Sequence, residues 1–104
     1  MFNKERVPKI NLTVPKKLLE TVIAYGEENE MTFSGCVRKS EKLYGTYVLE
    51  NKLIKKMEGE IVKQVKFKES EHQRIKEITY INKVWMTDYL NSCLEMMVYE
   101  GKEG

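Results

Sequence analysis

The chain has 104 residues, the length of a single domain. It carries 18 Lys and Arg against 16 Asp and Glu, and this formal net charge of +2 does not by itself mark a nucleic-acid binder. No apolar run approaches the roughly 18 residues of a membrane span. The start of the chain also lacks the apolar stretch of a signal peptide. We therefore expect one compact cytoplasmic domain over residues 1–104, with no membrane contact.

Residues suited to catalysis or metal binding are sparse. The two cysteines, Cys36 and Cys93, lie in helical patterns without the spacing of a metal site, which favours reduced, partly buried side chains. The one histidine, His72, lies in the first turn of a predicted helix, and no spacing brings a cysteine to it. The glycines do not form a phosphate-binding loop. We expect no enzymatic activity, no metal and no cofactor.

Residues 9–14 alternate strictly between polar and apolar side chains, the pattern of a strand with one buried face. The inward set is Ile10, Leu12 and Val14, and the outward set is Lys9, Asn11 and Thr13. Pro8 and Pro15 bracket the strand, and Pro15 suits the first turn of a following helix.

Two helices are predicted next, over 15–29 and from residue 34 or 35 onward. Thr32 and Ser34 are both candidate N-caps for the second helix. Apolar residues at helical spacing form the inward faces. The first face is Leu18, Leu19, Val22, Ile23 and Tyr25, and the second is Cys36, Val37, Ser40, Leu43, Tyr44, Tyr47 and Val48. Leu53, Ile54 and Met57 could prolong the second helix as far as Gly59.

The second half repeats this order less regularly. Val62, Gln64, Lys66 and Lys68 share one strand face, and Ile61, Val65 and Phe67 share the other, interrupted by Lys63. Ser70 followed by Gln73 is a capping-box pattern. A helical stripe follows at Ile75, Ile78, Ile81 and Val84, then a turn at 85–88. The last inward face is Tyr89, Leu90, Cys93, Leu94, Met97 and Val98. Most members of the set formed by Trp85 and the six tyrosines lie at helical spacing and are expected in the core, and stacking on bases is the alternative.

One offset of 53 residues aligns a first unit at 7–52 with a more divergent second unit at 60–101. It places Leu12 against Val65, and Val37 against Leu90. Leu18 against Glu71 is a mismatch, and the next position pairs a leucine with a histidine in the same way. A unit of this size cannot close a core alone, so two copies in one chain favour an internal dimer.

Residues 9–38 resemble the ribbon-helix-helix family, whose repressors include Arc and MetJ. The resemblance rests on the strand Ile10–Val14 closed by Pro15, on the turn Thr32-x-Ser34, and on Cys36-Val37-Arg38. It implies an α+β, mostly helical fold in which two ribbon-helix-helix units form an intramolecular pseudo-dimer. The expected ribbon pairs residues 9–14 with residues 62–67 in antiparallel fashion.

The resemblance also implies that the ribbon enters the DNA major groove. Lysine can donate to guanine, Asn and Gln can bond adenine, and Thr and Val can contact a thymine methyl group. The base-reading candidates are Lys9, Asn11, Thr13, Val62, Gln64 and Lys66. A solvated strand face is the alternative interpretation of these side chains.

Phosphate contacts are implied at the start of each second helix, where free N–H groups favour an anion. The candidates there are Thr32, Phe33, Ser34, Trp85, Met86 and Thr87, with added charge from Lys16, Lys17, Lys68 and Lys83. Ordinary N-capping would use the same hydroxyl groups, and an isolated lysine can simply be solvated.

The sequence thus predicts a sequence-specific binder of double-stranded DNA, acting as a transcriptional regulator or repressor. Further homo-oligomers could form on adjacent sites. Two alternatives stay open. One is an antitoxin-like interaction module whose second unit binds a protein, and the other is an accessory protein of conjugation or phage DNA processing.

Overall fold

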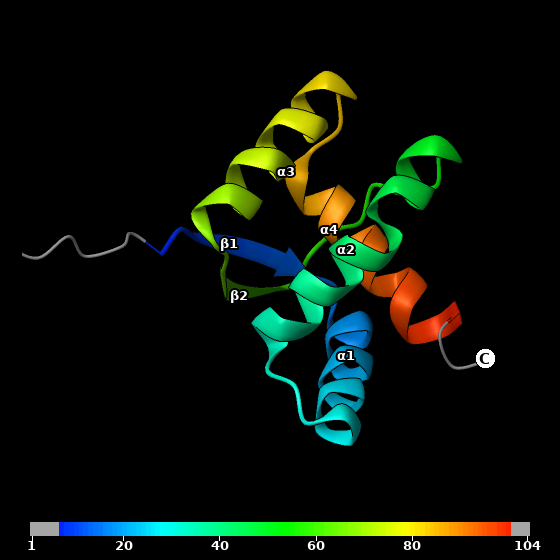
Figure 1. Ribbon diagram of the computed structural model, residues 1–104. Helices are drawn as coiled ribbons and strands as arrows, with labels where there is room; N and C mark the ends of the chain where they lie inside the picture. Colours follow the sequence, from blue (N-terminus) through cyan, green and yellow to red (C-terminus); the bar gives the residue numbers. More distant parts are fainter. Residues whose placement is uncertain (1–6, 101–104) are drawn as a thin grey trace, which may run out of the picture.

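The computed structural model describes residues 7–100. Its elements are β1 (Lys9–Val14), α1 (Lys16–Asn29), α2 (Phe33–Glu50), β2 (Ile61–Lys66), α3 (Glu69–Ile81), α4 (Met86–Glu95) and a short π-helical turn η1 (Met96–Glu100). The fold is α+β and predominantly helical, with a single two-stranded antiparallel sheet within the described residues (Figure 1). None of the helices in this range is long and apolar enough to cross a membrane.

The predicted antiparallel pairing of the two strand segments is confirmed. Lys9 lies opposite Lys66, and Val14 lies opposite Ile61, so β2 spans 61–66 and not the expected 62–67. One backbone bond continues the ladder beyond each end, from the Phe67 N–H to the Pro8 carbonyl at 3.0 Å and from the Glu60 N–H to the Val14 carbonyl at 3.1 Å.

The two faces of the ribbon differ as the alternation predicts. Leu12, Val14 and Val65 are fully buried against the helices. Lys63 shares this inward face and is only partly buried. Its ammonium group lies 5.9 Å from the centre of the Phe33 ring, so a cation–π contact compensates the charge that interrupts the apolar face.

The helices form the core beneath the ribbon. In Figure 1, α2 and α4 lie together at the centre, while α1 and α3 lie on opposite sides of this pair. The predicted core positions Val22, Val37, Ile75 and Leu90 are buried. The side chains that fill the remaining core include Leu18, Leu19, Val48, Phe67, Tyr89, Leu94, Met97 and Val98. Both cysteines are buried free thiols, as expected.

Several residues assigned to inward faces are exposed. Ile23, Leu43, Tyr47 and Ile81 lie at the surface, with Leu43 59% and Ile81 73% exposed. The expectation that the aromatic residues are mostly core was also wrong. Trp85 is 77% exposed and Tyr80 is also exposed, while Tyr89 is fully buried. A helix on the outside of a small domain buries only one stripe, and helical spacing alone does not fix how wide that stripe is.

Local geometry recurs at a constant spacing. α1 begins at Lys16 and α3 at Glu69, while α2 begins at Phe33 and α4 at Met86, so each pair of starts is 53 residues apart. The residues with left-handed backbone after α1 and α3 are Glu30, with φ of 54°, and Lys83, with φ of 56°, and these are also 53 residues apart. The backbone therefore turns at matching positions in the two halves of the chain.

The helix starts differ from the expected caps in one case. The Thr32 hydroxyl accepts a hydrogen bond from the Gly35 N–H at 3.0 Å, as predicted for an N-cap. The Ser70–Gln73 capping box was wrong, because α3 begins at Glu69 and Ser70 lies inside it. The Glu71 carboxylate instead accepts the Lys68 N–H at 2.9 Å.

The segment between α2 and β2 does not prolong the helix. α2 ends at Glu50, and residues 53–60, which form neither helix nor strand, lead back to the start of β2. Two bonds hold this segment on α4, from the Lys55 N–H to Ser92 Oγ at 3.0 Å and from the Met57 N–H to Asp88 Oδ1 at 3.3 Å. The early end of α2 leaves enough chain for the two strands of one molecule to pair.

Candidate nucleic-acid interface

The six base-reading candidates lie on one face of the ribbon as three cross-strand pairs. The pairs are Lys9 with Lys66, Asn11 with Gln64, and Thr13 with Val62. All are exposed except Thr13, which is partly buried. Paired residues of a sheet project to the same face, so the structure brings together every side chain that the strand pattern selected.

The pair of lysines at one end of this face is electrostatically unfavourable by itself. Lys9 and Lys66 are directly opposite each other, and like charges in this position destabilise a sheet. An anion over the ribbon would remove that repulsion. The central pair, Asn11 and Gln64, adds two amides that can each donate and accept hydrogen bonds.

Thr13 is held by groups that the sequence pattern did not identify. Its carbonyl accepts a bond from the Asn91 side-chain amide at 2.9 Å. Gly59 packs against it so closely that a Cβ at Gly59 would lie 2.2 Å from Thr13 Cγ2. Segment 53–60 and α4 therefore brace this end of the ribbon and cover part of the Thr13 side chain.

The start of α2 lies beside the lysine end of the ribbon. Ser34 Oγ accepts the Lys66 N–H at 3.2 Å, and the Thr32 hydroxyl is occupied by the Gly35 N–H. Each of these two hydroxyl oxygens thus accepts a bond within the protein, while its O–H group can still donate to a phosphate. The first N–H groups of α2, beginning at Phe33, are those that a helix leaves free for an anion.

The start of α4 offers a poorer anion site. Thr87 lies partly buried in the first turn, and its neighbour Asp88 uses its carboxylate to accept the Met57 N–H. Trp85, the N-cap residue, makes no side-chain capping bond. A carboxylate in the first turn repels phosphate, so the two helix starts are not equivalent.

The lysines expected to add phosphate charge are dispersed. Lys16 and Lys17 are exposed in the first turn of α1, and Lys68 is exposed just after β2. Lys83 lies beyond the far end of α3, about 20 Å along the helix axis from the ribbon at 1.5 Å per residue. Figure 1 shows the turn between α3 and α4 well away from the strands. The fold therefore separates Lys83 from the other candidates.

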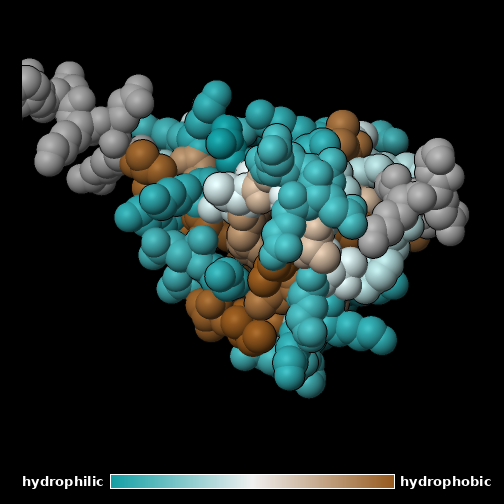
Figure 2. All heavy atoms as spheres, turned by 90° about the horizontal axis from the view of Figure 1, so that it is seen from below, coloured by the Kyte–Doolittle hydropathy of each residue, from teal (hydrophilic) through white to brown (hydrophobic). Residues whose placement is uncertain are grey.

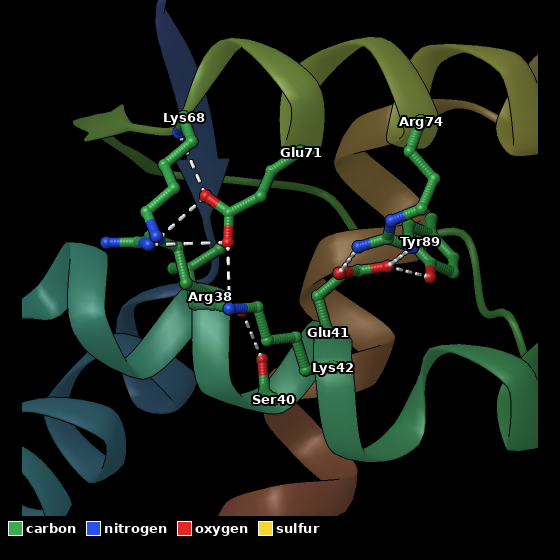
Figure 3. Close-up of polar contacts among 9 residues, drawn as sticks. Arg38, Ser40, Glu41, Lys42, Lys68, Glu71, Arg74 and Tyr89 are labelled. Atoms are coloured by element: carbon green, nitrogen blue, oxygen red, sulfur yellow. Dashed lines mark hydrogen bonds and ion pairs between the residues drawn. The ribbon is translucent and has the colours of Figure 1, made fainter. Parts of the chain in front are cut away.

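Sequence reasoning missed two ion-pair networks that connect α3 to α2 (Figure 3). Glu71 bonds Arg38 at 2.9 Å and Lys42 at 3.1 Å. Glu41, only 3% exposed, pairs with Arg74 and accepts the Tyr89 hydroxyl at 2.7 Å. A cavity of about 700 Å³ lies along the same helices. The sequence contained one indication of these networks, the mismatch between Leu18 and Glu71 at the offset of 53 residues. Leu18 makes an apolar contact in the first half, and Glu71 makes ion pairs at the corresponding position of α3.

Burial and hydrogen bonding shift several pKa values in this region. Burial acts to raise the pKa of Glu71, but bonds from the Lys68 N–H, Lys42 and Arg38 outweigh it and lower the pKa to about 2. Burial, with the bond to Glu41, raises the pKa of Tyr89. Burial likewise raises the pKa of Cys93 to about 12, so this thiol stays protonated and unreactive.

Glu71 predicts an acid-sensitive component of stability. Its pKa falls from 4.5 to about 2 on folding, so the stabilisation is present above pH 4.5 and is lost as the pH falls towards 2. We expect Glu71→Gln to remove about 1–3 kcal/mol from the free energy of unfolding at neutral pH and much less near pH 2. Urea unfolding at several pH values measures this. Glu69→Gln, at an exposed position of the same helix, is the control and should leave the pH profile unchanged.

Within residues 7–100, no group of three or more His, Cys, Asp or Glu side chains is arranged to hold a metal ion. The candidate interface consists of the outward ribbon face, the adjoining start of α2 and the lysines Lys16, Lys17 and Lys68. Comparison of the chain with family models, curated proteins and solved structures finds no match.

Proposed function

We propose that this chain binds double-stranded DNA sequence-selectively and regulates transcription, with the outward ribbon face in the major groove. The observation that carries the proposal is the alignment of Lys9, Asn11, Gln64 and Lys66 as facing pairs on one exposed surface. A two-stranded ribbon fits the major groove, where amide and ammonium groups can distinguish bases.

The proposal includes a ribbon-helix-helix pseudo-dimer within one chain. Asn11 and Gln64 are 53 residues apart and lie directly opposite each other. A twofold axis through the centre of the ribbon requires equivalent residues to meet there. The same spacing separates the starts of α1 and α3, and of α2 and α4, which supports an approximate twofold relation between the halves.

The two halves present different side chains to DNA. From the first strand come Lys9, Asn11 and Thr13, and from the second come Val62, Gln64 and Lys66. A family dimer of identical chains offers the same residues twice and favours a palindrome. We therefore expect this chain to prefer a site with an imperfect palindrome.

The experiment is selection of a site from a random DNA pool, followed by titration of variants against the selected and a scrambled duplex. Asn11→Ala should lose about 1–3 kcal/mol on the selected site and relax preference at one base pair. Lys16→Ala should weaken both duplexes alike and flatten the salt dependence, because a phosphate contact carries no base information. Lys52→Gln, at an exposed lysine beyond the end of α2, is the matched control.

Three outcomes discriminate the alternatives. If Asn11→Ala keeps full discrimination, the ribbon is not the reading surface. If the wild-type chain binds no DNA at low salt, the proposal is wrong and an antitoxin-like interaction protein becomes the better explanation. If the selected site maps to a transfer origin and not to a promoter, DNA binding stands but the role is in DNA processing.

A further inference from the structure

The turn between α3 and α4 carries a cluster of exposed apolar side chains. Tyr80 is 85%, Ile81 73% and Trp85 77% exposed. Tyr80 and Trp85 line a shallow cavity of about 410 Å³, together with residues that include Val84 and Lys76. Large apolar side chains gathered at one exposed point are typical of a contact surface. We call residues 76–86 the apolar corner.

The turn between α1 and α2 has a matching groove. Its cavity of about 380 Å³ is lined by residues that include Glu27, Glu30, Met31 and Phe33. Six of its lining positions lie 53 residues before lining positions of the cavity at the apolar corner. The two grooves therefore occupy corresponding places in the two halves of the chain. We call residues 23–33 the acidic corner.

The two corners differ in charge. The acidic corner holds three glutamates, Glu27, Glu28 and Glu30, and no Lys or Arg of its own. Lys39 contacts Tyr25 and Lys63 contacts Phe33 from neighbouring elements. The apolar corner holds Lys76 and Lys83 with one acidic residue, Glu77. The six charged side chains of the two corners are exposed. Figure 2, which views the molecule from the side of the acidic corner, shows a hydrophobic band flanked by hydrophilic spheres. A groove with an acidic rim complements an apolar projection accompanied by lysines.

We propose that the apolar corner of one molecule docks on the acidic corner of a second copy of this chain. Two acidic corners would bring three glutamates against three glutamates, and two apolar corners would bring together two surfaces that each carry a net charge of +1. The unlike pairing removes both repulsions and covers Trp85 and Tyr80. This association does not depend on DNA binding.

The geometry makes the association head-to-tail. The two corners lie at opposite ends of the molecule, and the strands lie between them (Figure 1). A contact between unlike surfaces leaves one free corner at each end, so copies add head to tail into a ring or an open chain and do not close as a symmetric dimer. Neither corner includes a strand residue, so the ribbon face stays uncovered, whereas the acidic corner reaches the start of α2 at Thr32 and Phe33.

The experiment is sedimentation equilibrium of the full chain over a wide concentration range at low salt. The wild-type chain should form a concentration-dependent series of species that salt weakens. Trp85→Ser should weaken association at least about tenfold, as loss of a buried tryptophan anchor does. Glu30→Lys and Lys83→Glu should each weaken it about fivefold, because each puts like charges across the contact.

The decisive test exchanges the charges of Glu30 and Lys83. Glu30 and Lys83 have nearly the same left-handed backbone, with φ of 54° and 56°, so each position already accommodates the type of residue that the other would receive. The double variant Glu30→Lys/Lys83→Glu should regain association, and so should an equimolar mixture of the two single variants. Lys52→Glu, at a third left-handed residue with φ of 53° outside both corners, is the control and should associate like wild type.

Other results overturn the proposal. If Trp85→Ser weakens association while Glu30→Lys does not, the apolar corner binds another apolar corner. If the wild-type chain stays monomeric throughout, the corner does not bind a second copy. If neither the double variant nor the mixture recovers, the corners do not meet. Thermal melts of each variant identify any loss of folding, and the mixture of single variants tests the contact without requiring the double substitution.

Discussion

Val37→Asp should remove a large part of the stability of the chain and lower its melting temperature by at least about 15 °C. Val37 is fully buried in α2 and belongs to the core beneath the ribbon. An aspartate there would place a carboxylate without a partner in an apolar environment, at a cost of about 4 kcal/mol or more. A domain of this size has a total stability of only about 5–15 kcal/mol. Circular dichroism against temperature and urea measures the loss.

Leu43→Asp is the matched control for this substitution. Leu43 lies on the same helix and was also predicted to face inward, but it is 59% exposed. The aspartate would remain in water, so the free energy of unfolding should change by less than about 0.5 kcal/mol. An unchanged melting temperature for Val37→Asp, or a collapse caused by Leu43→Asp, would contradict the observed core.

Arg74→Met should lower the free energy of unfolding by about 3 kcal/mol. The substitution would leave the Glu41 carboxylate buried, because Glu41 is only 3% exposed. Among the described residues, the Tyr89 hydroxyl would be its one remaining side-chain partner. Arg74 bonds Glu41 through two guanidinium nitrogens, one of them at 2.8 Å. Removal of Arg74 therefore leaves the buried Glu41 carboxylate without its cationic partner. Urea unfolding at neutral pH measures the change.

Two further variants test that explanation. The double variant Glu41→Gln/Arg74→Met removes both charges and should recover a large part of the lost stability. Lys55→Met breaks the Lys55–Glu95 pair, whose side chains are 64% and 31% exposed, and should cost less than about 1 kcal/mol. If Arg74→Met costs no more than Lys55→Met, the buried network does not stabilise α3 against α2.

The strand ribbon could be predicted from sequence because alternation has a short and unambiguous period. Strict alternation over residues 9–14 assigned each side chain of β1 to its correct face. The rougher pattern of the second strand still identified its outward residues. Its boundary moved by one residue. Lys63 interrupts the inward face, as the sequence pattern indicated, and its ammonium group lies over the Phe33 ring.

The candidate site was predictable only in part. The six ribbon residues meet as expected, since a shared strand face needs only the correct pairing. Lys83 was grouped with the phosphate contacts from its position in sequence, but α3 carries it away from the strands. The hydroxyls of Thr32 and Ser34 proved to bond Gly35 and Lys66, which a count of polar residues cannot foresee.

The sequence by itself determined the order of elements, the alternation of the strands and the spacing of 53 residues at which helices begin. The start of each helix and the alternation of each strand depend on residues only a few positions away in the sequence. The tertiary structure decided which charged side chains are buried. Glu41 and Glu71 look like solvated helix residues, and only the approach of α3 to α2 pairs them with Arg74 and Arg38. It also decided that Trp85 is exposed, because burial depends on contacts between distant segments that no local pattern encodes.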